Sequence, residues 1–294
     1  MKGIIVMNAY PNGEKFFRQS GRIAEELKKV GAETDIRLNG SVLTGVSRDG
    51  RAAGICGYDF AVYLDKDKYL GRILEKSGLR LFNRAKAVEI CDDKMLTYLA
   101  LSESGLFVPE TIAAPLCYTP GMVADGRFLA SVADRLGFPL VVKKSYGSFG
   151  KDVRLIHGMG ELKEVAQEFL YVPHFFQEYI AESSGRDIRV IVVGGKAIAA
   201  MERRAKEGEF RSNIELGGEG FPVRLTGSFR EAAEHAAKTL GLDYCGVDLL
   251  DSDGRPVLCE VNSNAFFEGI EQVTGVNVAA AYARHIAEAS RSEA

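Results

Sequence analysis

Apolar and polar positions in the first third of the chain follow periods that predict strands separated by helices. Apolar runs bounded by turn residues indicate strands, and a 3.6-residue apolar period indicates amphipathic helices. The expected elements are strands at 3–8, 34–38, 59–64 and 80–82, helices at 14–30 and 67–76, and a short hairpin at 42–55. Strands that alternate with helices form a mostly parallel sheet, so residues 1–91 are expected to be a small α/β domain.

The pattern changes after residue 91, where hairpins join the helices and give the rest of the chain α+β character. The expected helices are 92–100, 127–137, 161–169, 229–240 and 277–290, and the expected strands are 140–142, 153–156, 187–193 and 196–203. We expect the overall class to be α/β, with a central domain at 92–180 and a C-terminal domain at 181–294. The glycines of one segment predict a flexible loop, namely Gly208, Gly217, Gly218 and Gly220.

Residues 243–264 form the most informative segment, a β-hairpin that turns at 251–254. Alternation predicts an apolar face made by Cys245, Val247, Leu249, Val257, Cys259 and Val261. The opposite face carries Asp248, Glu260 and Asn262, with Asp248 opposite Leu258 and Glu260 one diagonal step away. Two carboxylates and an amide oxygen suit Mg²⁺ that also binds phosphates. A solvated polar face is the alternative interpretation of this trio.

A second candidate site lies in residues 139–156, where a buried-strand run ends in Lys143 and a turn of small residues follows. Glycines let backbone N–H groups approach phosphate oxygens, and the lysine adds a positive charge. The order of residues is not that of a P-loop, because a strand follows the turn instead of a helix. An ordinary β-turn is the alternative.

Two further segments complete the candidate chemistry. Residues 175–180 predict an extended hinge whose backbone could pair with an adenine edge, and a carboxylate there could hold ribose hydroxyls. Residues 199–213 concentrate four basic side chains, Arg203, Arg204, Lys206 and Arg211, in a chain with a net charge of −3. Such a cluster indicates an anionic partner, with a solvated charge run as the alternative.

Composition is typical of a soluble globular protein and gives no indication of a membrane-spanning or disulfide-rich protein. The 294 residues are 46% hydrophobic and 26% charged, and no apolar run reaches the length of a membrane span. Five cysteines without paired spacing predict reduced thiols in a cytoplasmic protein, and Cys245 and Cys259 are expected to pack in the core. Four scattered histidines give no support for a histidine-based hydrolase. Neither nucleic acid nor membrane is an expected partner.

From about Lys94 to the C-terminus the chain resembles the RimK branch of the ATP-grasp ligases. The segments that carry the resemblance occur in the family's order: Lys94, Val142-Lys143, Gly147-Ser-Phe-Gly150, Gln177-Glu-Tyr-Ile180, Asp187-Ile-Arg189, Glu202-Arg-Arg-Ala-Lys206, Phe210-Arg-Ser-Asn213, Gly246-Val-Asp248 and Glu260-Val-Asn-Ser-Asn264. Residues 1–90 fit the family's first domain in pattern only. The resemblance implies an ATP-grasp fold behind an N-terminal parallel-sheet domain.

The resemblance also implies a role for individual residues. ATP is expected to be held by Lys94, Lys143, Gly147, Ser148, Gly150, Gln177, Glu178, Tyr179, Ile180 and Asp187, with Glu178 and Ile180 reaching adenine through backbone and Asp187 reaching ribose. Asp248, Glu260 and Asn262 would hold Mg²⁺, with Mn²⁺ as an alternative. Arg203 and Arg211, with Asn213 beside them, would bind the activated carboxylate, and Arg189 and Asn264 would bind substrate.

The implied activity joins a carboxylate to an amine through an acyl phosphate, with ADP as product. Glutamate is the favoured amino acid, and the acceptor is a protein C-terminus, a peptide or a small carboxylate; a homo-oligomer is expected. Phe266-Phe267 departs from the family pattern and is expected to pack. Two alternatives stay open: an ATP-grasp protein that binds nucleotide without ligase chemistry, and a D-alanine-type ligase, which the Arg-Arg-Ala-Lys and Phe-Arg-Ser-Asn segments disfavour.

Overall fold

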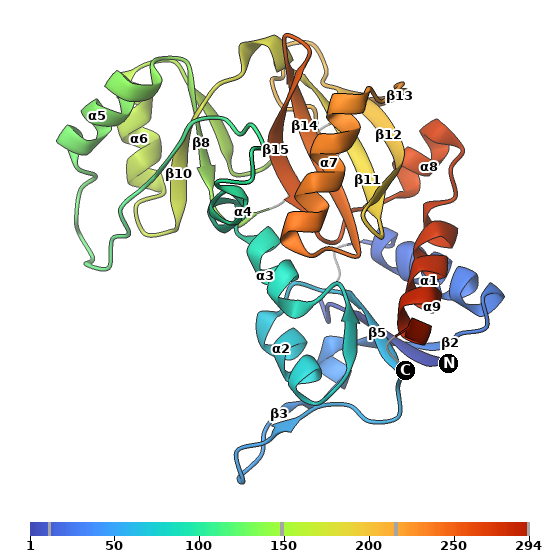
Figure 1. The fold of residues 1–294 in the computed structure, drawn as a ribbon. Coiled ribbons are helices and arrows are strands. Elements are labelled where there is room, and N and C mark those ends of the chain that lie inside the picture. Colours follow the sequence, from blue (N-terminus) through green and yellow to red (C-terminus); the bar gives the residue numbers. More distant parts are fainter. Residues whose placement is uncertain (11–12, 148–149, 215–216, 293–294) are drawn as a thin grey trace.

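The described residues fold into three main β-sheets flanked by helices, with a fourth, two-stranded sheet beside them, as the computed structural model shows (Figure 1). The structure describes residues 1–10, 13–147, 150–214 and 217–292. One sheet is parallel and lies in the N-terminal part, and the two main sheets that follow it, of four and five strands, are antiparallel. This mixture confirms the expected α/β class with α+β character in the later part of the chain.

The N-terminal sheet is four-stranded and parallel, in the order β2-β1-β5-β6. Its strands are β1 (Lys2–Met7), β2 (Glu33–Leu38), β5 (Phe60–Leu64) and β6 (Arg80–Phe82), and its helices are α1 (Lys15–Lys29) and α2 (Lys68–Lys76). Strand β1 is central and almost wholly buried, because helices cover both faces of the sheet. The carboxyl ends of β1 and β5 therefore meet at one edge.

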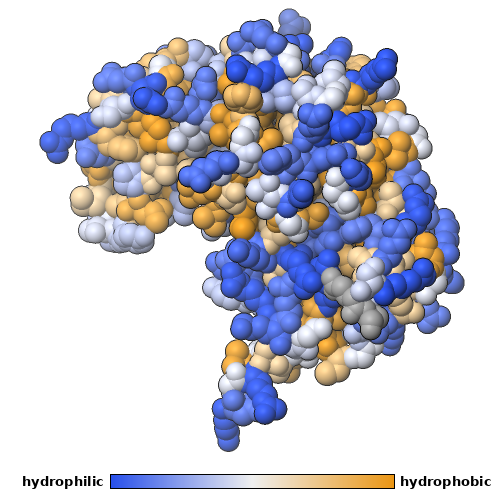
Figure 2. Space-filling model, in the orientation of Figure 1, coloured by the Kyte–Doolittle hydropathy of each residue, from blue (hydrophilic) through white to orange (hydrophobic). Residues whose placement is uncertain are grey.

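The expected hairpin in this region is present as β3 (Gly45–Val46) and β4 (Ala52–Ala53), with the turn at Asp49-Gly50. It projects from the body of the N-terminal sheet, and Figure 2 shows that its tip is hydrophilic.

The central sheet is antiparallel, in the order β7-β10-β8-β9. Its strands are β7 (Thr111–Ala113), β8 (Leu140–Lys144), β9 (Val153–Ile156) and β10 (His174–Glu178). Helices α5 (Gly126–Leu136) and α6 (Met159–Glu168) bury one apolar face of this sheet. Two short helices, α3 (Ala85–Asp92) and α4 (Lys94–Leu101), connect it to the N-terminal sheet, and Asp93 caps α4 with its side chain.

The C-terminal sheet has five antiparallel strands in the order β13-β12-β11-β14-β15. They are β11 (Arg186–Val193), β12 (Lys196–Arg204), β13 (Glu219–Pro222), β14 (Tyr244–Ser252) and β15 (Arg255–Asn262). Helix α7 (Gly227–Leu240) packs on one face, and α8 (Glu268–Thr274) and α9 (Val278–Ser292) pack on the other. Helix α9 also packs against α1, which brings the two ends of the chain close together (Figure 1).

Most expected elements are present within a few residues of their expected bounds, and the differences are local. Strands β7 and β13 and helices α3 and α8 were not expected from the pattern. The prediction that Gly220 belongs to a flexible loop was wrong, because Gly220 lies within β13 and pairs with Arg203 of β12. Across the described residues, no helix combines the length and the apolarity that crossing a bilayer requires.

Candidate active site

One large cavity, of about 840 Å³, opens where the three sheets meet. Every expected site residue that the structure describes lines it: Lys94, Lys143, Gly147, Gly150, Gln177, Glu178, Tyr179, Ile180, Asp187, Arg189, Arg203, Arg211, Asn213, Asp248, Glu260, Asn262 and Asn264. Ser148 lies outside the described residues. Segments that are up to 170 positions apart in sequence, from Lys94 to Asn264, therefore share one surface.

The β14–β15 hairpin places Asp248, Glu260 and Asn262 on the cavity side, but not in the expected register. Asp248 lies directly opposite Glu260, and Gly246 lies opposite Asn262. The expectation that Asp248 faces Leu258 was wrong, because a bulge at Cys259 shifts the pairing by one residue between Asp248 and Leu249. Direct pairing brings the two carboxylates closer together than the diagonal arrangement would.

The expectation that Cys259 packs in the core was wrong, and the same bulge is the reason. Cys245 is fully buried in the core, as expected, but Cys259 lines the cavity, and its Sγ lies 3.9 Å from Nζ of Lys143. The extra residue turns Cys259 away from the core, and Leu258 takes the buried place beside Val261. Cys259 therefore belongs to the floor of the site.

Asp248 is held by two arginines. Its Oδ1 accepts from Nε of Arg189 at 2.7 Å, and its Oδ2 accepts from Arg189 at 2.6 Å and from Arg203 at 2.9 Å. Burial of the group opposes ionisation, yet Arg189 and Arg203 together hold the pKa of Asp248 below its ordinary value. Asp248 is thus a buried anion with its counter-charges already in place.

Glu260 has a basic neighbour of its own. Lys94 Nζ lies 3.1 Å from Glu260 Oε1 and donates to the backbone oxygen of Gly147 at 2.8 Å. Burial works against the charged carboxylate, but the Lys94 ammonium keeps the pKa of Glu260 lowered. Lys94 thereby connects the β14–β15 hairpin to the turn that follows β8.

Asp248, Glu260 and Asn262 fit a divalent cation. The two carboxylates are ionised and the third residue is an amide, which is the hard-oxygen set that Mg²⁺ takes. Nδ2 of Asn262 is buried and makes no hydrogen bond within the described part of the chain, so this amide is not engaged through its nitrogen there. Within that part, no cluster of three His, Cys, Asp or Glu residues could hold a metal.

Arg203 is enclosed by acidic groups. It is 5% exposed and donates from Nε to Oδ1 of Asp187 at 2.7 Å, since the two residues face each other across β11 and β12. The second oxygen of Asp187 accepts from Oγ of Ser212 at 2.6 Å. Burial opposes the charge on Arg203, but Asp187 and Asp248 raise its pKa. The Asp187 carboxylate, expected at the ribose, is engaged by Arg203 and Ser212 in this state.

Arg211 pairs with the carboxylate of Glu209, a residue that the sequence analysis did not assign to the site. Glu209 accepts from its Nε at 2.9 Å and from its Nη2 at 2.7 Å, and this pairing with Arg211 lowers the pKa of Glu209. Nη1 of Arg211 donates to the backbone oxygen of Gly150 at 2.6 Å. The basic cluster divides, because Arg203 and Arg211 line the cavity whereas Arg204 is exposed and pairs with Glu202.

The expected adenine hinge borders the cavity at the end of β10. The N–H of Glu178 donates to the backbone oxygen of Glu110 at 2.8 Å, so this group is already used within the protein. Gln177 is 1% exposed and donates to Thr111 Oγ1 at 2.8 Å. Tyr179 packs edge-to-face on Phe210, which ties the hinge to the segment that carries Arg211.

The N-terminal sheet supplies one wall that sequence reasoning did not assign. Asn8, Tyr10 and Asp65 line the cavity from the carboxyl ends of β1 and β5. Phe16 of α1 meets Phe266 edge-to-face, with ring centroids 4.9 Å apart. A polar residue directly after a buried strand was the signal that could have identified Asp65.

Two expectations about the segment after β15 have separate outcomes. Phe267 is 2% exposed and packs in the core, as expected, whereas Phe266 lines the cavity. Oδ1 of Asn264 accepts from Gln19 of α1 at 3.3 Å, so this expected substrate residue is held from the N-terminal side.

Comparison with known proteins identifies the family. Residues 92–286 match the RimK-like ATP-grasp domain, and the chain therefore belongs to the RimK-like ATP-grasp family. It is 39% identical over 254 residues to a probable alpha-L-glutamate ligase of Thioalkalivibrio sulfidiphilus, covering 84% of this chain and 78% of that protein. It is 38% identical over 220 residues to beta-citrylglutamate synthase B of Danio rerio, covering 74% of this chain and 53% of that protein.

Solved structures confirm the ATP-grasp fold. The ATP-grasp ligase PsnB, complexed with a phosphomimetic variant of its minimal precursor, Mg and ADP, superposes with a TM-score of 0.68 at 18% identity, over 98% of each chain. D-alanine--D-alanine ligase from Bacillus anthracis, complexed with ATP, gives a TM-score of 0.73 at 20% identity, over 100% of this chain and 98% of that one.

Proposed function

We propose that this protein is an ATP-dependent carboxylate–amine ligase that forms an amide bond through an acyl phosphate and releases ADP. One observation carries the proposal: Asp248, Glu260 and Asn262 share one cavity with two lysines, Lys94 and Lys143, and with an extended hinge. A carboxylate and an amine do not condense readily in water, because hydroxide is a poor leaving group. Phosphorylation of the carboxylate replaces it with phosphate, and the enzyme positions the groups and screens their charge.

The lysines and the turn after β8 would bind the phosphates of ATP. Lys94 and Lys143 offer ammonium groups at the cavity wall, and Gly147 and Gly150 allow close approach of the backbone. Glu178 and Ile180 would contact adenine, with the carbonyl of Glu178 accepting where its N–H is engaged. Asp187 would contact the ribose. For this contact to form, Asp187 must lose its hydrogen bond to Arg203 or to Ser212.

Asp248, Glu260 and Asn262 would hold Mg²⁺, and Mn²⁺ is the alternative ion. When bound, the ion supplies charge neutralisation at the phosphates. Arg189 and Arg203 now neutralise Asp248, so binding of a cation at Asp248 would release both guanidinium groups toward the cavity. Released Arg203, together with Arg211 and Asn213, would hold the acyl phosphate, and Arg189 and Asn264 would contact substrate.

Glutamate is the proposed amine, since the names of both relatives above contain this amino acid. The acceptor would be a carboxylate on a peptide, a protein C-terminus or a small molecule. We also propose that the three sheets correspond to an N-terminal domain at 1–91, a central lid at 92–180 and a C-terminal domain at 181–294. The homo-oligomer remains a prediction.

The decisive experiment incubates the protein with Mg-ATP, a panel of amino acids and three acceptors: a short peptide that ends in glutamate, N-acetylaspartate and citrate. We expect ADP and phosphate in a one-to-one ratio with an amide product, measured by chromatography and mass spectrometry. Release of AMP and pyrophosphate would contradict acyl-phosphate chemistry. Tight ATP binding without turnover for any combination of amino acid and acceptor would instead favour the alternative that the protein binds nucleotide without ligase activity.

A further inference from the structure

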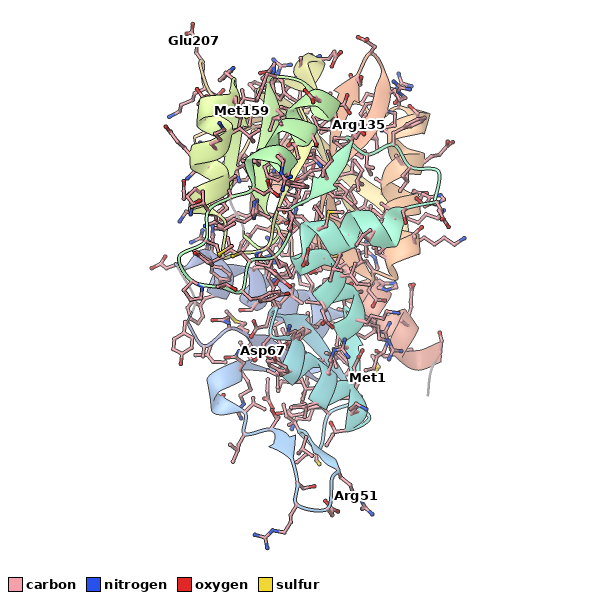
Figure 3. The ribbon with its side chains drawn as sticks, turned by 90° about the vertical axis from the view of Figure 1, so that its left-hand side faces the viewer. Met1, Arg51, Asp67, Arg135, Met159 and Glu207 are labelled. Atoms are coloured by element: carbon pink, nitrogen blue, oxygen red, sulfur yellow. The ribbon has the colours of Figure 1, made fainter. Side chains whose placement is uncertain are left out.

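The wall of the cavity that comes from the N-terminal sheet contains a carboxylate with unusual surroundings. Asp65 directly follows β5, and Asn8 directly follows β1, so both lie at the carboxyl ends of neighbouring parallel strands. Ligands of parallel sheets bind at this edge. Figure 3 labels Asp67, two residues further on, in the N-terminal part of the molecule, between Arg51 at the lower end and the other two sheets above.

The hydrogen bonds of Asp65 come from amide groups. Oδ1 accepts from Asn8 Nδ2 at 3.2 Å and from the backbone N–H groups of Lys66 and Asp67 at 2.7 and 3.3 Å. Oδ2 accepts from Asn39 Nδ2 at 2.6 Å. These four donors fix the orientation of the carboxylate, and within the described part of the chain Oδ2 accepts one bond and has room for another.

The other carboxylates of the cavity differ from Asp65. Five of them bond to an arginine or lysine side chain: Asp152 to Lys144, Asp187 to Arg203, Asp248 to Arg189, Glu260 to Lys94 and Glu268 to Arg18. Among the described residues that line the cavity, only Asp65 and Glu178 have amide donors alone, and Glu178 belongs to the hinge. Asp65 is therefore the carboxylate on the substrate side whose charge the protein leaves without a cation in contact.

A short route of contacts links Asp65 to the candidate metal site. The next residue, Lys66, pairs with Asp92 at 2.7 Å. Asp93 caps helix α4, whose first residue, Lys94, pairs with Glu260 at 3.1 Å. Asp65 and Glu260 also line the same cavity.

We propose that Asp65, oriented by Asn8 and Asn39, binds the ammonium group of the amine substrate. The ammonium loses one proton to solvent before its nitrogen attacks the acyl carbon, and the second proton is taken up by the phosphate that leaves when the C–O bond breaks. The inference rests on the proposed ligase function and extends it, because it assigns the amine a subsite on the N-terminal wall. An ammonium carries three N–H donors, and it suits a buried carboxylate whose Oδ2 accepts one bond from the described residues. Burial raises the pKa of Asp65, and an ammonium in contact would offset this cost by favouring the charged carboxylate.

The test separates the amine step from the formation of the acyl phosphate. Hydroxylamine is uncharged at neutral pH and traps acyl phosphates as hydroxamates, so it needs no ammonium subsite. For Asp65→Asn, we expect kcat/KM for the amino acid to fall about 10- to 100-fold, mainly through KM, the scale of a lost bond to a charged group. Hydroxamate formation from the same acceptor and Mg-ATP should stay within about threefold of the unaltered protein, since the variant keeps every group assigned to that step.

Asp35→Asn is the matched control, because Asp35 lies in the same sheet, accepts from Tyr58 at 2.7 Å and lies outside the cavity lining. Neither reaction should change in this control. Should Asp65→Asn not fold, Asn8→Ala removes one orienting donor, and we expect a smaller rise in KM for the amine with unchanged hydroxamate formation.

Three outcomes would overturn the proposal. Equal losses of amide and hydroxamate would mean that Asp65 acts through the fold or the acyl step. Unchanged use of the amino acid would mean that the ammonium binds elsewhere. If the unaltered protein forms neither hydroxamate nor amide, the ligase function itself fails and the subsite fails with it.

Discussion

At the scale of single residues, the candidate site is an array of buried and half-buried charges, each of which lies beside an opposite charge. Arg189 and Arg203 neutralise Asp248, Lys94 neutralises Glu260, and Glu209 neutralises Arg211. A charge buried without a partner costs several kcal/mol, so each of these pairs preserves the fold as well as the site. Substitutions must therefore be chosen so that catalytic and structural effects can be separated.

Glu260→Gln should lower kcat by about two to three orders of magnitude while the protein stays folded. The change removes one proposed metal carboxylate but keeps the shape of the side chain and the apolar face of the hairpin. Steady-state kinetics at saturating Mg-ATP and denaturant unfolding measure the two effects. Asp253→Asn, at the exposed turn of the same hairpin, is the control; a near-normal rate for Glu260→Gln would return the trio to a solvated polar face.

Arg211→Ala should reduce catalysis far more than it reduces ATP affinity. Loss of one charge-assisted anion contact should cost about 2–4 kcal/mol of transition-state stabilisation, roughly 30- to 1,000-fold in rate. The measurements are kcat/KM for the acceptor and a direct titration of ATP binding. Arg204→Ala removes an exposed arginine of the same segment and should change neither by more than about 1 kcal/mol. Near-normal activity of Arg211→Ala would show that the basic residues of segment 199–213 are surface charges without a role in catalysis.

Arg203→Ala is expected to differ from Arg211→Ala because Arg203 lies between two buried carboxylates. Its removal leaves Asp187 and Asp248 without this cation, and should lower the free energy of unfolding by about 3–5 kcal/mol. Urea denaturation of the two variants measures the contrast. Equal stability of the two variants would show that Asp187 and Asp248 find other partners.

At the scale of elements, the sequence predicted those whose signals are local. The 243–264 hairpin has alternating residues and an Asp253-Gly254 turn, whose φ angles of 52° and 83° match what these residue types allow. Strand β13 contains Gly220 and Pro222, residues that disfavour strands, and exists because β12 pairs with it. The bulge at Cys259 has no local signal, so the register of the metal trio and the place of Cys259 could not be derived.

The candidate site also divides into residues that have a local sequence signal and residues that only tertiary contacts bring together. Lys143, the glycine turn and the Asp/Glu/Asn trio are recognisable because spacing and residue type suffice. The Glu209–Arg211 pair and the N-terminal wall depend on how loops and separate sheets meet, which periodicity does not encode. Register alone, by contrast, makes Asp187 face Arg203, once β11 and β12 are known to form a hairpin.

Helix α6 and the central sheet should lose stability in mild acid because of His174. This residue is 5% exposed, packs between Phe169 and Phe176, and donates from Nδ1 to Val172 O at 2.9 Å. Burial lowers the pKa of His174 below its ordinary value of 6.5. The unfolded chain therefore takes up a proton first, and the stabilisation that is present above pH 6.5 declines as the pH falls toward the folded pKa.

Replacement by a residue that does not titrate tests this dependence. In His174→Gln, the slope of the free energy of unfolding against pH should become shallower below pH 6.5, whatever the change at neutral pH. Urea denaturation at a series of pH values gives both slopes. His157→Gln, at an exposed position, is the control; identical slopes for His174→Gln and the unaltered protein would contradict the assignment.

At the scale of the whole molecule, a junction around Asn83 and Asp243 contributes to holding the N-terminal sheet against the C-terminal sheet, and so to the shape of the cavity. Asn83 is 1% exposed and bonds four backbone groups, those of Asp243, Tyr244 (twice) and Ser263, at 2.7–3.0 Å. Arg80 contacts both carboxylate oxygens of Asp243 at 3.0 Å, and His285 Nε2 lies 2.8 Å from the same group. Asp243 thus connects β6, β14 and α9.

Asp243→Ala should weaken this junction and, through it, the binding of substrates that touch both walls. The Arg80 and Asp243 side chains are 15% and 11% exposed, so loss of the carboxylate should lower the free energy of unfolding by about 3 kcal/mol. Glu89→Ala is the control, because the Arg72–Glu89 pair is more exposed and should contribute below about 1 kcal/mol.

In the folded fraction, KM for the amine should rise more than the Kd for ATP, because the N-terminal wall carries Asp65 whereas the nucleotide contacts lie on the other two sheets. Calorimetric unfolding and paired titrations measure both effects, and a rise in the ATP Kd alone would show that the junction does not position the N-terminal wall.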